Sequence, residues 1–229
     1  MEYLDIVDEN GNPTGETVER AYAHKHGVRH RTAHVWILRK RDDKIQVLLQ
    51  KRAETKSFPG CYDISSAGHI TAGQEFYESA VRELHEELGI TASEADLVYC
   101  GDRRIVWDDV FFGEEYHDRQ FTKVFLLWAD VKENDLVLQE EEVSSVLWMN
   151  LDECIIGVRK NAFKNCIYPE ELEMVRKKFM QVKTVKMGMY EDYDRTNLFY
   201  ISCGFKELEV FPLLWDEANP CQIYIMSLK

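Results

Sequence analysis

The sequence predicts an α/β fold in which a mixed sheet carries helices on its faces. Runs of apolar and β-branched residues at 34–38 and 45–50 flank a polar turn at residues 40–43, which is typical of paired antiparallel strands. Residues 62–66 form another strand-like run, which a glycine loop joins to a helix over residues 74–88. Strands and helices in this order pack as layers around one core.

The first 27 residues predict a strand, a turn and a short helix. Residues 4–7 are strand-like and lead into Asn10-Gly11, the strongest hairpin signal among dipeptides. We expect a helix over residues 17–26, which Gly27 ends.

Periodicity predicts the helix over residues 74–88. Its apolar residues recur at spacings of three and four and so form one buried stripe: Tyr77, Val81, Leu84 and Leu88. Gly89 stands where a helix ends in a left-handed residue.

The rest of the chain predicts further strands and a second helix. The strands are expected at residues 97–100, 104–107, 122–128 and 143–148. Pro169 suits the first turn of a helix that runs to about residue 180. Beyond it we expect a small α/β appendage, with strands at residues 184–187, 209–211 and 222–226 and a helix over 194–203.

Composition bounds the class of protein. A chain of 229 residues with 45% hydrophobic and 30% charged residues can bury one sizeable core, with room for a small appendage. No apolar run is long enough to span a bilayer and the N-terminus lacks a basic signal-peptide start, so we expect a cytoplasmic protein without a membrane partner. The six cysteines form no CxxC pair, which disfavours a cysteine zinc site or a disulfide framework.

The net charge of −13 argues against a nucleic-acid partner. Basic residues nevertheless outnumber acidic ones between Arg20 and Lys56. This segment suits an anionic phosphorylated substrate, although residues 39–44 are equally typical of a solvated hairpin turn.

Three carboxylates share one face of the helix at residues 74–88. Glu83, Glu86 and Glu87 stand at i, i+3 and i+4, where helical side chains are neighbours, and no cation at i+4 from Glu83 relieves their repulsion. Mg²⁺ prefers oxygen ligands of this kind. The alternative is a solvated acidic surface.

The full spacing resembles the Nudix box, in which a glycine loop precedes a helix with Arg-Glu and Glu-Glu pairs. Eight of the nine fixed positions of the box match, namely Gly68, Arg82, Glu83, Leu84, Glu86, Glu87, Gly89 and Ile90. Gln74 departs from the pattern, since the family has its first glutamate there.

This resemblance implies a Nudix α/β/α sandwich over residues 1–165, followed by a helical linker at 166–181. It implies hydrolysis of a diphosphate linkage with Mg²⁺, or Mn²⁺, held by Glu83, Glu86 and Glu87. Glu83 and Glu86 then serve catalysis, and Arg82 orients the neighbouring glutamate.

Further site residues are expected outside the helix. Glu142, in an acidic loop before a strand, is the candidate general base; the alternative is a solvated turn. Lys51 and Arg52 end a strand where they could reach substrate phosphate. Gly68 and His69 lie in the loop that would meet the substrate, although His69 could equally cap or pack.

The flanks resemble the branch of the family most similar to isopentenyl diphosphate isomerase. The resemblance rests on residues 30–32, 49–52, 58–60 and 63–69. The isomerase has a reactive cysteine just before a Ser-His pair, whereas Ser66-Ala67-Gly68-His69 has no thiol, which disfavours isomerisation.

Residues 182–229 resemble the C-terminal end of a GNAT acetyltransferase, through residues 199–205 and 214–221. No glycine-rich pyrophosphate loop precedes them, which disfavours acetyl transfer. Exposed strands in this segment could pair two chains into a homodimer.

The leading hypothesis is Mg²⁺-dependent hydrolysis of a nucleoside diphosphate derivative or a related organic diphosphate. The alternative is a non-catalytic Nudix-type module that binds and senses a phosphorylated metabolite. The sequence does not identify the group attached to the diphosphate.

Overall fold

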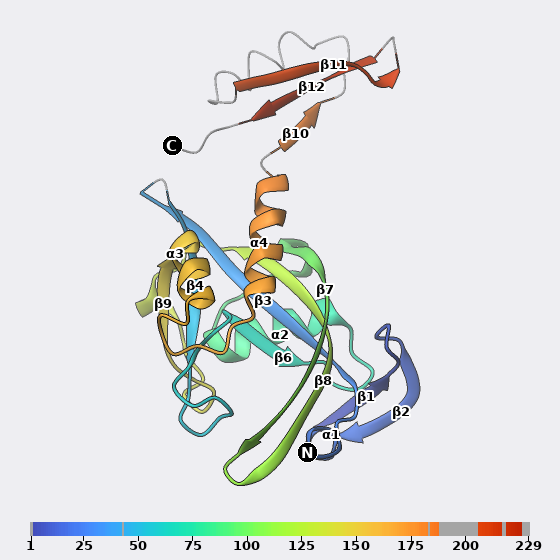
Figure 1. Cartoon of the computed structure of the whole chain (residues 1–229), viewed down its shortest axis with the longest axis vertical. Helices are drawn as coiled ribbons and strands as arrows, with labels where there is room; N and C mark the ends of the chain where they lie inside the picture. Colours follow the sequence, from blue (N-terminus) through green and yellow to red (C-terminus); the bar gives the residue numbers. More distant parts are fainter. Residues whose placement is uncertain (1, 43, 183, 188–205, 217–218, 226–229) are drawn as a thin grey trace. The chain divides into compact units, whose positions relative to one another are not determined.

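The computed structural model describes residues 2–42, 44–182, 184–187, 206–216 and 219–225, with side chains as far as residue 179 (Figure 1). The chain divides into two compact units, Met1–Val175 and Arg176–Lys229. In the described part of the chain, no helix is both long enough and apolar enough to cross a membrane.

A seven-stranded mixed sheet forms the centre of the first unit. Its main path runs in the order β5-β4-β3-β8-β7, with β6 paired to β3 and β9 paired to β4. The strands are β3 (His30–Arg41), β4 (Lys44–Arg52), β5 (Tyr62–Asp63), β6 (Ser66–His69), β7 (Leu97–Phe111), β8 (Glu114–Trp128) and β9 (Val143–Asn150). Because β3 pairs with β8 in parallel and with β4 and β6 antiparallel, the predicted mixed sheet is confirmed.

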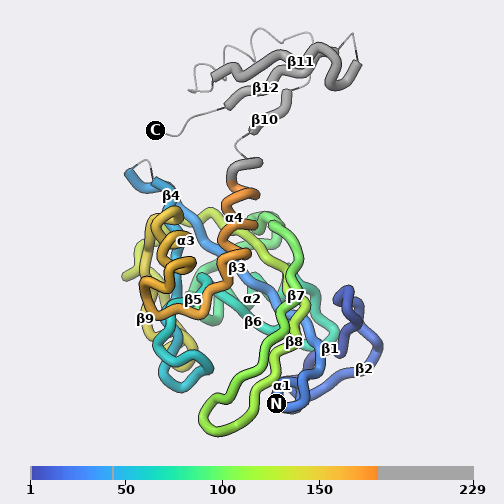
Figure 2. Tube along the Cα trace, viewed as in Figure 1, coloured from blue at the N-terminus to red at the C-terminus, as the bar shows by residue number. Residues whose placement is uncertain are grey.

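The strands predicted at residues 97–100 and 104–107 are one continuous strand, β7. Its register against β8 shifts between Tyr99 and Gly101, and Gly101 has a φ of +147°. The sequence signal of a break therefore marks a β-bulge and not a turn. Figure 2 shows β3, β8 and β7 side by side.

The two faces of the sheet differ in what they bury. Ala33, Val35 and Ile37 of β3 join one hydrophobic cluster with Ala80 and Leu84 of α2 (Phe76–Leu88). Side chains alternate along a strand, so the intervening residues of β3 face the other way, toward α4 (Pro169–Val182). In Figure 1, α4 crosses in front of β3, whereas α2 lies behind the sheet.

The N-terminal segment forms a hairpin of β1 (Tyr3–Val7) and β2 (Pro13–Glu19), followed by α1 (Arg20–His26). The predicted helix start at residue 17 was wrong, because Thr17 and Glu19 pair with β1. Gly27, with a φ of +64°, ends α1 as predicted.

Three short elements had no sequence prediction. They are α3 (Leu151–Arg159) and the 3₁₀ turns η1 (Glu94–Asp96) and η2 (Glu133–Asp135). Asn150 begins α3, because its side chain accepts a hydrogen bond from the backbone N–H of Glu153 at 3.1 Å.

The second unit contains β10 (Thr184–Met187), β11 (Lys206–Asp216) and β12 (Asn219–Ile225) in an antiparallel sheet of order β10-β12-β11. These strands confirm the three predicted in this segment. The helix predicted over residues 194–203 lies outside the described residues.

Candidate active site

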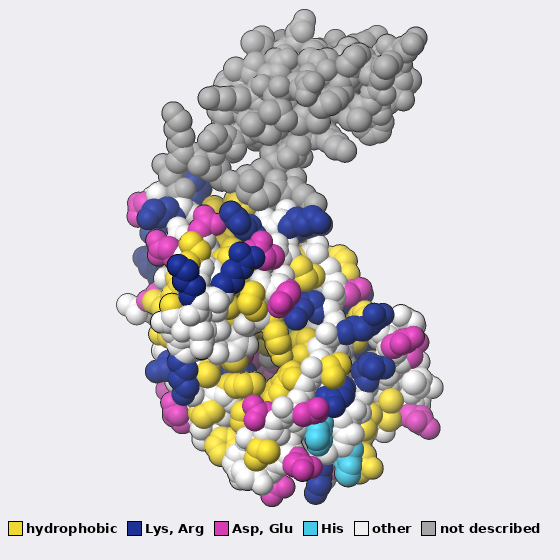
Figure 3. All heavy atoms as spheres, viewed as in Figure 1, with side chains coloured by type: hydrophobic (Ala, Val, Ile, Leu, Met, Phe, Trp, Pro, Cys, Tyr) yellow, Lys and Arg dark blue, Asp and Glu magenta, His cyan; other side chains and the backbone are white. Residues whose placement is uncertain are grey.

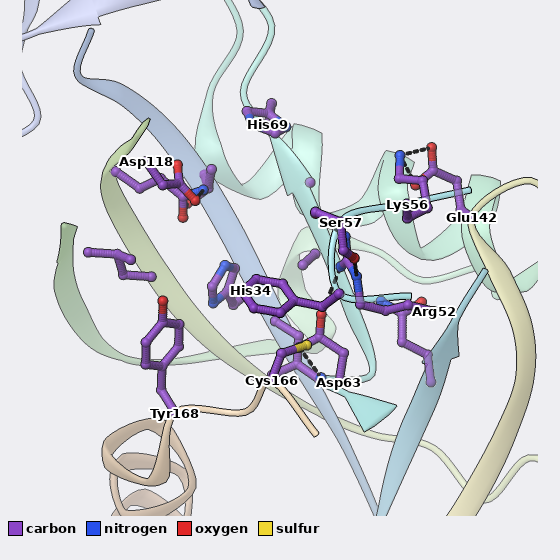
Figure 4. Close-up of a pocket in the computed structure, with 18 of the residues that line it drawn as sticks. His34, Arg52, Lys56, Ser57, Asp63, His69, Asp118, Glu142, Cys166 and Tyr168 are labelled. Carbon is purple, nitrogen blue, oxygen red and sulfur yellow. Dashed lines mark hydrogen bonds and ion pairs between the residues drawn. The ribbon is translucent and has the colours of Figure 1, made fainter. Parts of the chain in front are cut away.

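A cavity opens on the sheet face opposite α2 (Figure 4). Strands β3, β4, β6, β7 and β8 contribute to its wall, together with the residues around the start of α4. Its charged and aromatic side chains include Arg20, Arg52, Lys56, Asp63, Glu87, Asp118, Glu142, Glu171, Phe58, Trp107, Tyr116 and Tyr168. Figure 3 shows hydrophobic side chains gathered around a hollow on this face.

Glu87 of α2 lines the cavity, and Glu83 lies one turn before it on the same helix. Glu87 is 4% exposed, and its Oε2 accepts a hydrogen bond from the backbone N–H of Ala67 at 3.2 Å. Burial, followed by the nearby charge of Glu83, raises the pKa of Glu87 to about 8. Burial likewise raises the pKa of Glu83 to about 7. Two desolvated carboxylates close enough to repel each other suit a hard divalent cation, which would offset both effects.

Gly68 makes room for one of these carboxylates. A Cβ atom at this position would lie 2.1 Å from Cδ of Glu83. From the sequence, Gly68 was expected in the loop that would meet the substrate. In the structure the backbone of Gly68 approaches the Glu83 carboxyl group. Gly68 therefore shapes the site by leaving room for the carboxylate of Glu83.

Arg82 relieves the repulsion on the glutamate face. Its Nη1 lies 2.8 Å from Oε2 of Glu86, and its Nη2 lies 2.9 Å from Oε1 of Glu83. The search for a cation at i+4 from Glu83 missed Arg82, because Arg82 directly precedes Glu83 in the chain. Glu86 has a half-exposed side chain and is not among the cavity-lining residues, whereas Glu87 is buried.

Of the two strand residues predicted to reach phosphate, Lys51 and Arg52, only Arg52 lies at the cavity. Arg52 lines the cavity and is fixed by Asp63, whose Oδ2 lies 2.8 Å from Nη1. Lys51 is not among the lining residues, as expected from the alternation of side chains along β4. Lys56, which was not predicted as a site residue, lines the cavity and pairs with Glu142 at 2.6 Å. The predicted base therefore has a cation as its direct partner.

The basic residues between Arg20 and Lys56 divide between two places in the structure. Arg41 and Lys44 lie at the exposed end of the β3–β4 hairpin, where Arg41 pairs with Asp130 at 3.0 Å. Arg20 and Arg52 line the cavity, where they can attract an anionic ligand.

Three histidines come together, and one of them, His69, lines the cavity. Each of His24, His30 and His69 offers one ring nitrogen, and these three atoms lie within 4.8 Å of one another. Nε2 of His24 is 3.0 Å from Nε2 of His69. Oδ1 of Asp118 is 3.6 Å from Nδ1 of His24. Among the described residues, neither of these two atoms has a hydrogen-bond partner, and the same is true of Nε2 of His30.

The histidine cluster is a set of neutral nitrogen ligands. Burial, followed by the charge of His30, lowers the pKa of His24 to about 3, and burial lowers that of His30 to about 4. Neutral imidazoles are ligands for transition metal ions, so the cluster could hold one of these beside the oxygen site of Glu83 and Glu87. His69 alone was predicted as a site residue, because nothing in the local sequence pattern links it to His24 on α1 or His30 on β3.

Comparison with known proteins agrees with this fold. A family model described as the NUDIX domain matches residues 28–170. The uncharacterized Nudix hydrolase CA_C0446 of Clostridium acetobutylicum is 34% identical over 153 residues, which cover 66% of this chain and 71% of that protein. Nudix hydrolase 3 of Arabidopsis thaliana is 36% identical over 157 residues, but the match covers only 20% of it.

Among solved structures, the crystal structure of DR0079 from Deinococcus radiodurans has a TM-score of 0.54 and covers 76% of this chain and 98% of its own. At 19% identity this likeness concerns the fold. The family match and the relatives together show that the chain belongs to the Nudix family and is a Nudix-type pyrophosphohydrolase.

Proposed function

We propose that the protein hydrolyses the diphosphate linkage of a small organic diphosphate, such as a nucleoside diphosphate derivative, with Mg²⁺ as its cation and Mn²⁺ as the alternative. The observation that carries this proposal is the pairing of Glu87, which is buried, with Glu83, whose side chain is 14% exposed, beside a cavity that Glu87, Arg20, Arg52 and Lys56 line. Acidic ligands for a cation and cationic groups for phosphate oxygens are both required by this chemistry.

Each group has a distinct role in the proposal. Glu83 and Glu87 hold the cation, which when bound polarises the phosphoryl oxygens. Arg52, fixed by Asp63, orients the diphosphate, and Gly68 leaves room for the Glu83 carboxyl group. Glu86 acts through Arg82, which it shares with Glu83.

The test is a panel of organic diphosphates read by mass spectrometry with Mg²⁺, Mn²⁺ or a chelator. We expect cation-dependent release of a monophosphate or of inorganic phosphate from some member of the panel. Glu87→Gln should lower kcat by about 10²-fold or more, the order typical of removing one electrostatic stabiliser from a site.

Glu78→Gln is the matched control, because Glu78 is exposed on the same helix. Equal turnover by Glu87→Gln and Glu78→Gln would contradict the proposed role of Glu87. Tight binding of a panel member without turnover would instead support the metabolite-binding alternative. An isomerised product would restore the isomerase interpretation that the missing thiol disfavours.

For the second unit the earlier predictions stand as proposals. Residues 182–229 are proposed as a GNAT-like appendage to a Nudix domain at 1–165, with 166–181 between them, and pairing of its strands is the proposed route to a homodimer. Sedimentation equilibrium of the full chain tests the dimer, and a monomer at all concentrations would exclude it.

A further inference from the structure

A buried histidine and a buried glutamate meet at the cavity wall. Nδ1 of His34, on β3, lies 3.0 Å from both carboxylate oxygens of Glu171, on the first turn of α4. Both residues line the cavity. Neither belongs to the Nudix box or to the carboxylates considered above.

Three donors hold Glu171 as a fixed carboxylate. It is 0% exposed, and besides His34 it accepts hydrogen bonds from Nη1 of Arg103 at 2.6 Å and from Nε1 of Trp36 at 3.1 Å. Burial alone would raise the pKa of Glu171, but His34 and Arg103 outweigh burial and hold it below its ordinary value. An ionised carboxylate requires a proton on the nitrogen that faces it, so Nδ1 of His34 carries the hydrogen.

The tautomer leaves Nε2 of His34 as the free acceptor. The side chain of His34 keeps 10% exposure, and Nε2 is not among the buried side-chain atoms that lack a partner. Because Nδ1 is taken by Glu171, the accessible edge of the ring presents Nε2 toward the cavity. Figure 4 shows His34 between Asp118 and Tyr168 on this wall.

The pair also lies beside the proposed diphosphate site. His34 is the register partner of Ala67 across β3 and β6, and the N–H of Ala67 donates to Glu87. A neutral imidazole oriented by a carboxylate is the usual arrangement of a general base. Glu142 lacks this arrangement, because its carboxylate is paired with Lys56 at 2.6 Å.

We propose that His34 is a catalytic residue that takes a proton during hydrolysis and that Glu171 is its positioning residue; the inference rests on the proposed hydrolysis of a diphosphate. One O–H bond of a water molecule breaks, its oxygen bonds to phosphorus, and the proton moves to Nε2 of His34. The P–O bond of the bridging oxygen breaks, and its electron pair leaves with the departing group. The imidazolium keeps its Nδ1 hydrogen bond to Glu171 and later returns the added proton to the departing oxygen or to solvent.

The role of His34 can be tested by steady-state kinetics of the full chain. The substrate is an organic diphosphate from the panel that the native protein hydrolyses. His34→Ala should lower kcat by about 10²-fold, the lower end of the range for a general base, with little change in KM. Added imidazole should restore part of kcat, because it can occupy the space left by the ring and accept the proton. His34→Asn keeps a donor for Glu171 but no proton acceptor, so it should lose activity while keeping the native fold.

The matched controls remove the same chemical group at exposed positions. His26→Ala on α1 and Glu170→Gln on α4 should keep the native kcat, since both residues are exposed and neither lines the cavity. A native kcat in His34→Asn would overturn the inference. So would a loss in His34→Ala that imidazole does not restore, or a rise in KM alone. If the native protein hydrolyses no diphosphate of the panel, the proposed function is wrong. The proposed proton transfer to His34, which depends on that function, is then wrong as well.

A second measurement does not depend on activity. Nitrogen NMR of histidine-labelled protein should show His34 with its proton on Nδ1, and Glu171→Gln should shift that signal and lower kcat by about tenfold. Glu170→Gln should leave the signal unchanged. A His34 that carries its proton on Nε2 in the native protein would exclude the proposed orientation.

Discussion

Glu83 and Glu87 make the folded protein sensitive to alkali when no cation is bound. Their pKa values of about 7 and about 8 lie above the value near 4.3 expected in the unfolded chain. Between pH 7 and 8 the folded state therefore binds more protons than the unfolded state, so stability falls as pH rises through this window. His24 and His30, whose pKa values are lowered, are neutral in the folded state here and mostly neutral in the unfolded state.

Thermal unfolding in a chelator, measured from pH 7 to pH 8, checks this expectation. The melting temperature should fall across the window in the native protein and in the Glu78→Gln control. It should stay nearly level in the double variant Glu83→Gln, Glu87→Gln. Excess Mg²⁺ should raise the melting temperature more at pH 8 than at pH 7, and an equal rise at both would contradict the assignment of these carboxylates as ligands.

Gly68 controls the position of Glu83. Gly68→Ala should lower kcat by about 10²-fold, the order expected for a misplaced electrostatic group, because the new methyl group overlaps the Glu83 carboxyl group. Gly15→Ala is the opposite case: it has open space but a φ of +92°, so it should lower the melting temperature and leave kcat unchanged.

Sequence spacing located the carboxylates of the site but not their environments. It placed Glu83, Glu86 and Glu87 on one face, and the structure buries Glu87 while Glu86 stays half exposed. The difference arises because strand β6 covers part of that face, and Ala67 donates its N–H to Glu87. Helical periodicity does not show which side chains a neighbouring strand will cover.

At the scale of elements, α3 depends on its first residue. Asn150→Ala removes the side-chain acceptor for the N–H of Glu153 and should cost about 1 kcal/mol. For a chain of this size that corresponds to a fall of about 2–4 °C in melting temperature. Asn150→Asp keeps the acceptor and serves as the control; an equal fall in both variants would show that the cap is not the cause.

Elements with a strong local signal were predicted well. The hairpin of β3 and β4, the helix α2 and its glycine end all follow from patterns within a few residues. By contrast, α3 follows β9 without an intervening turn residue, so the apolar run of the strand hides the start of the helix. Only the start of the helix predicted over residues 17–26 was wrong, because pairing with β1 holds residues 17–19 in a strand.

At the scale of the whole molecule, the cavity is built within the first unit. Every residue that lines it lies between Arg20 and Glu171. We therefore expect a chain that ends after Val182, which keeps α4 complete, to retain the kcat and KM of the full protein on a turned-over diphosphate. Loss of turnover with native circular dichroism would show that residues 183–229 contribute to catalysis.

The assembly of the site could not be predicted from the sequence. His24, His69 and Asp118 come from α1, β6 and β8. The parallel pairing of β3 with β8 joins residues ninety positions apart in the chain, such as Thr32 and Thr122. Such contacts depend on the order of strands in the sheet. Sequence patterns within a few residues do not indicate the order of the strands in the sheet.

The hydrogen bond between His34 and Glu171 joins residues 137 positions apart. During synthesis, the ribosome releases the strands of the sheet and the glutamates of α2 well before it releases α4. Arg103 and His34 thus lack their shared carboxylate until that helix emerges, and the cavity wall stays incomplete for several seconds at ordinary rates of translation, roughly 5–20 residues per second. The site is therefore complete only after α4 has left the ribosome. A nascent chain that already contains Glu83 and Glu87 still lacks the carboxylate of Glu171.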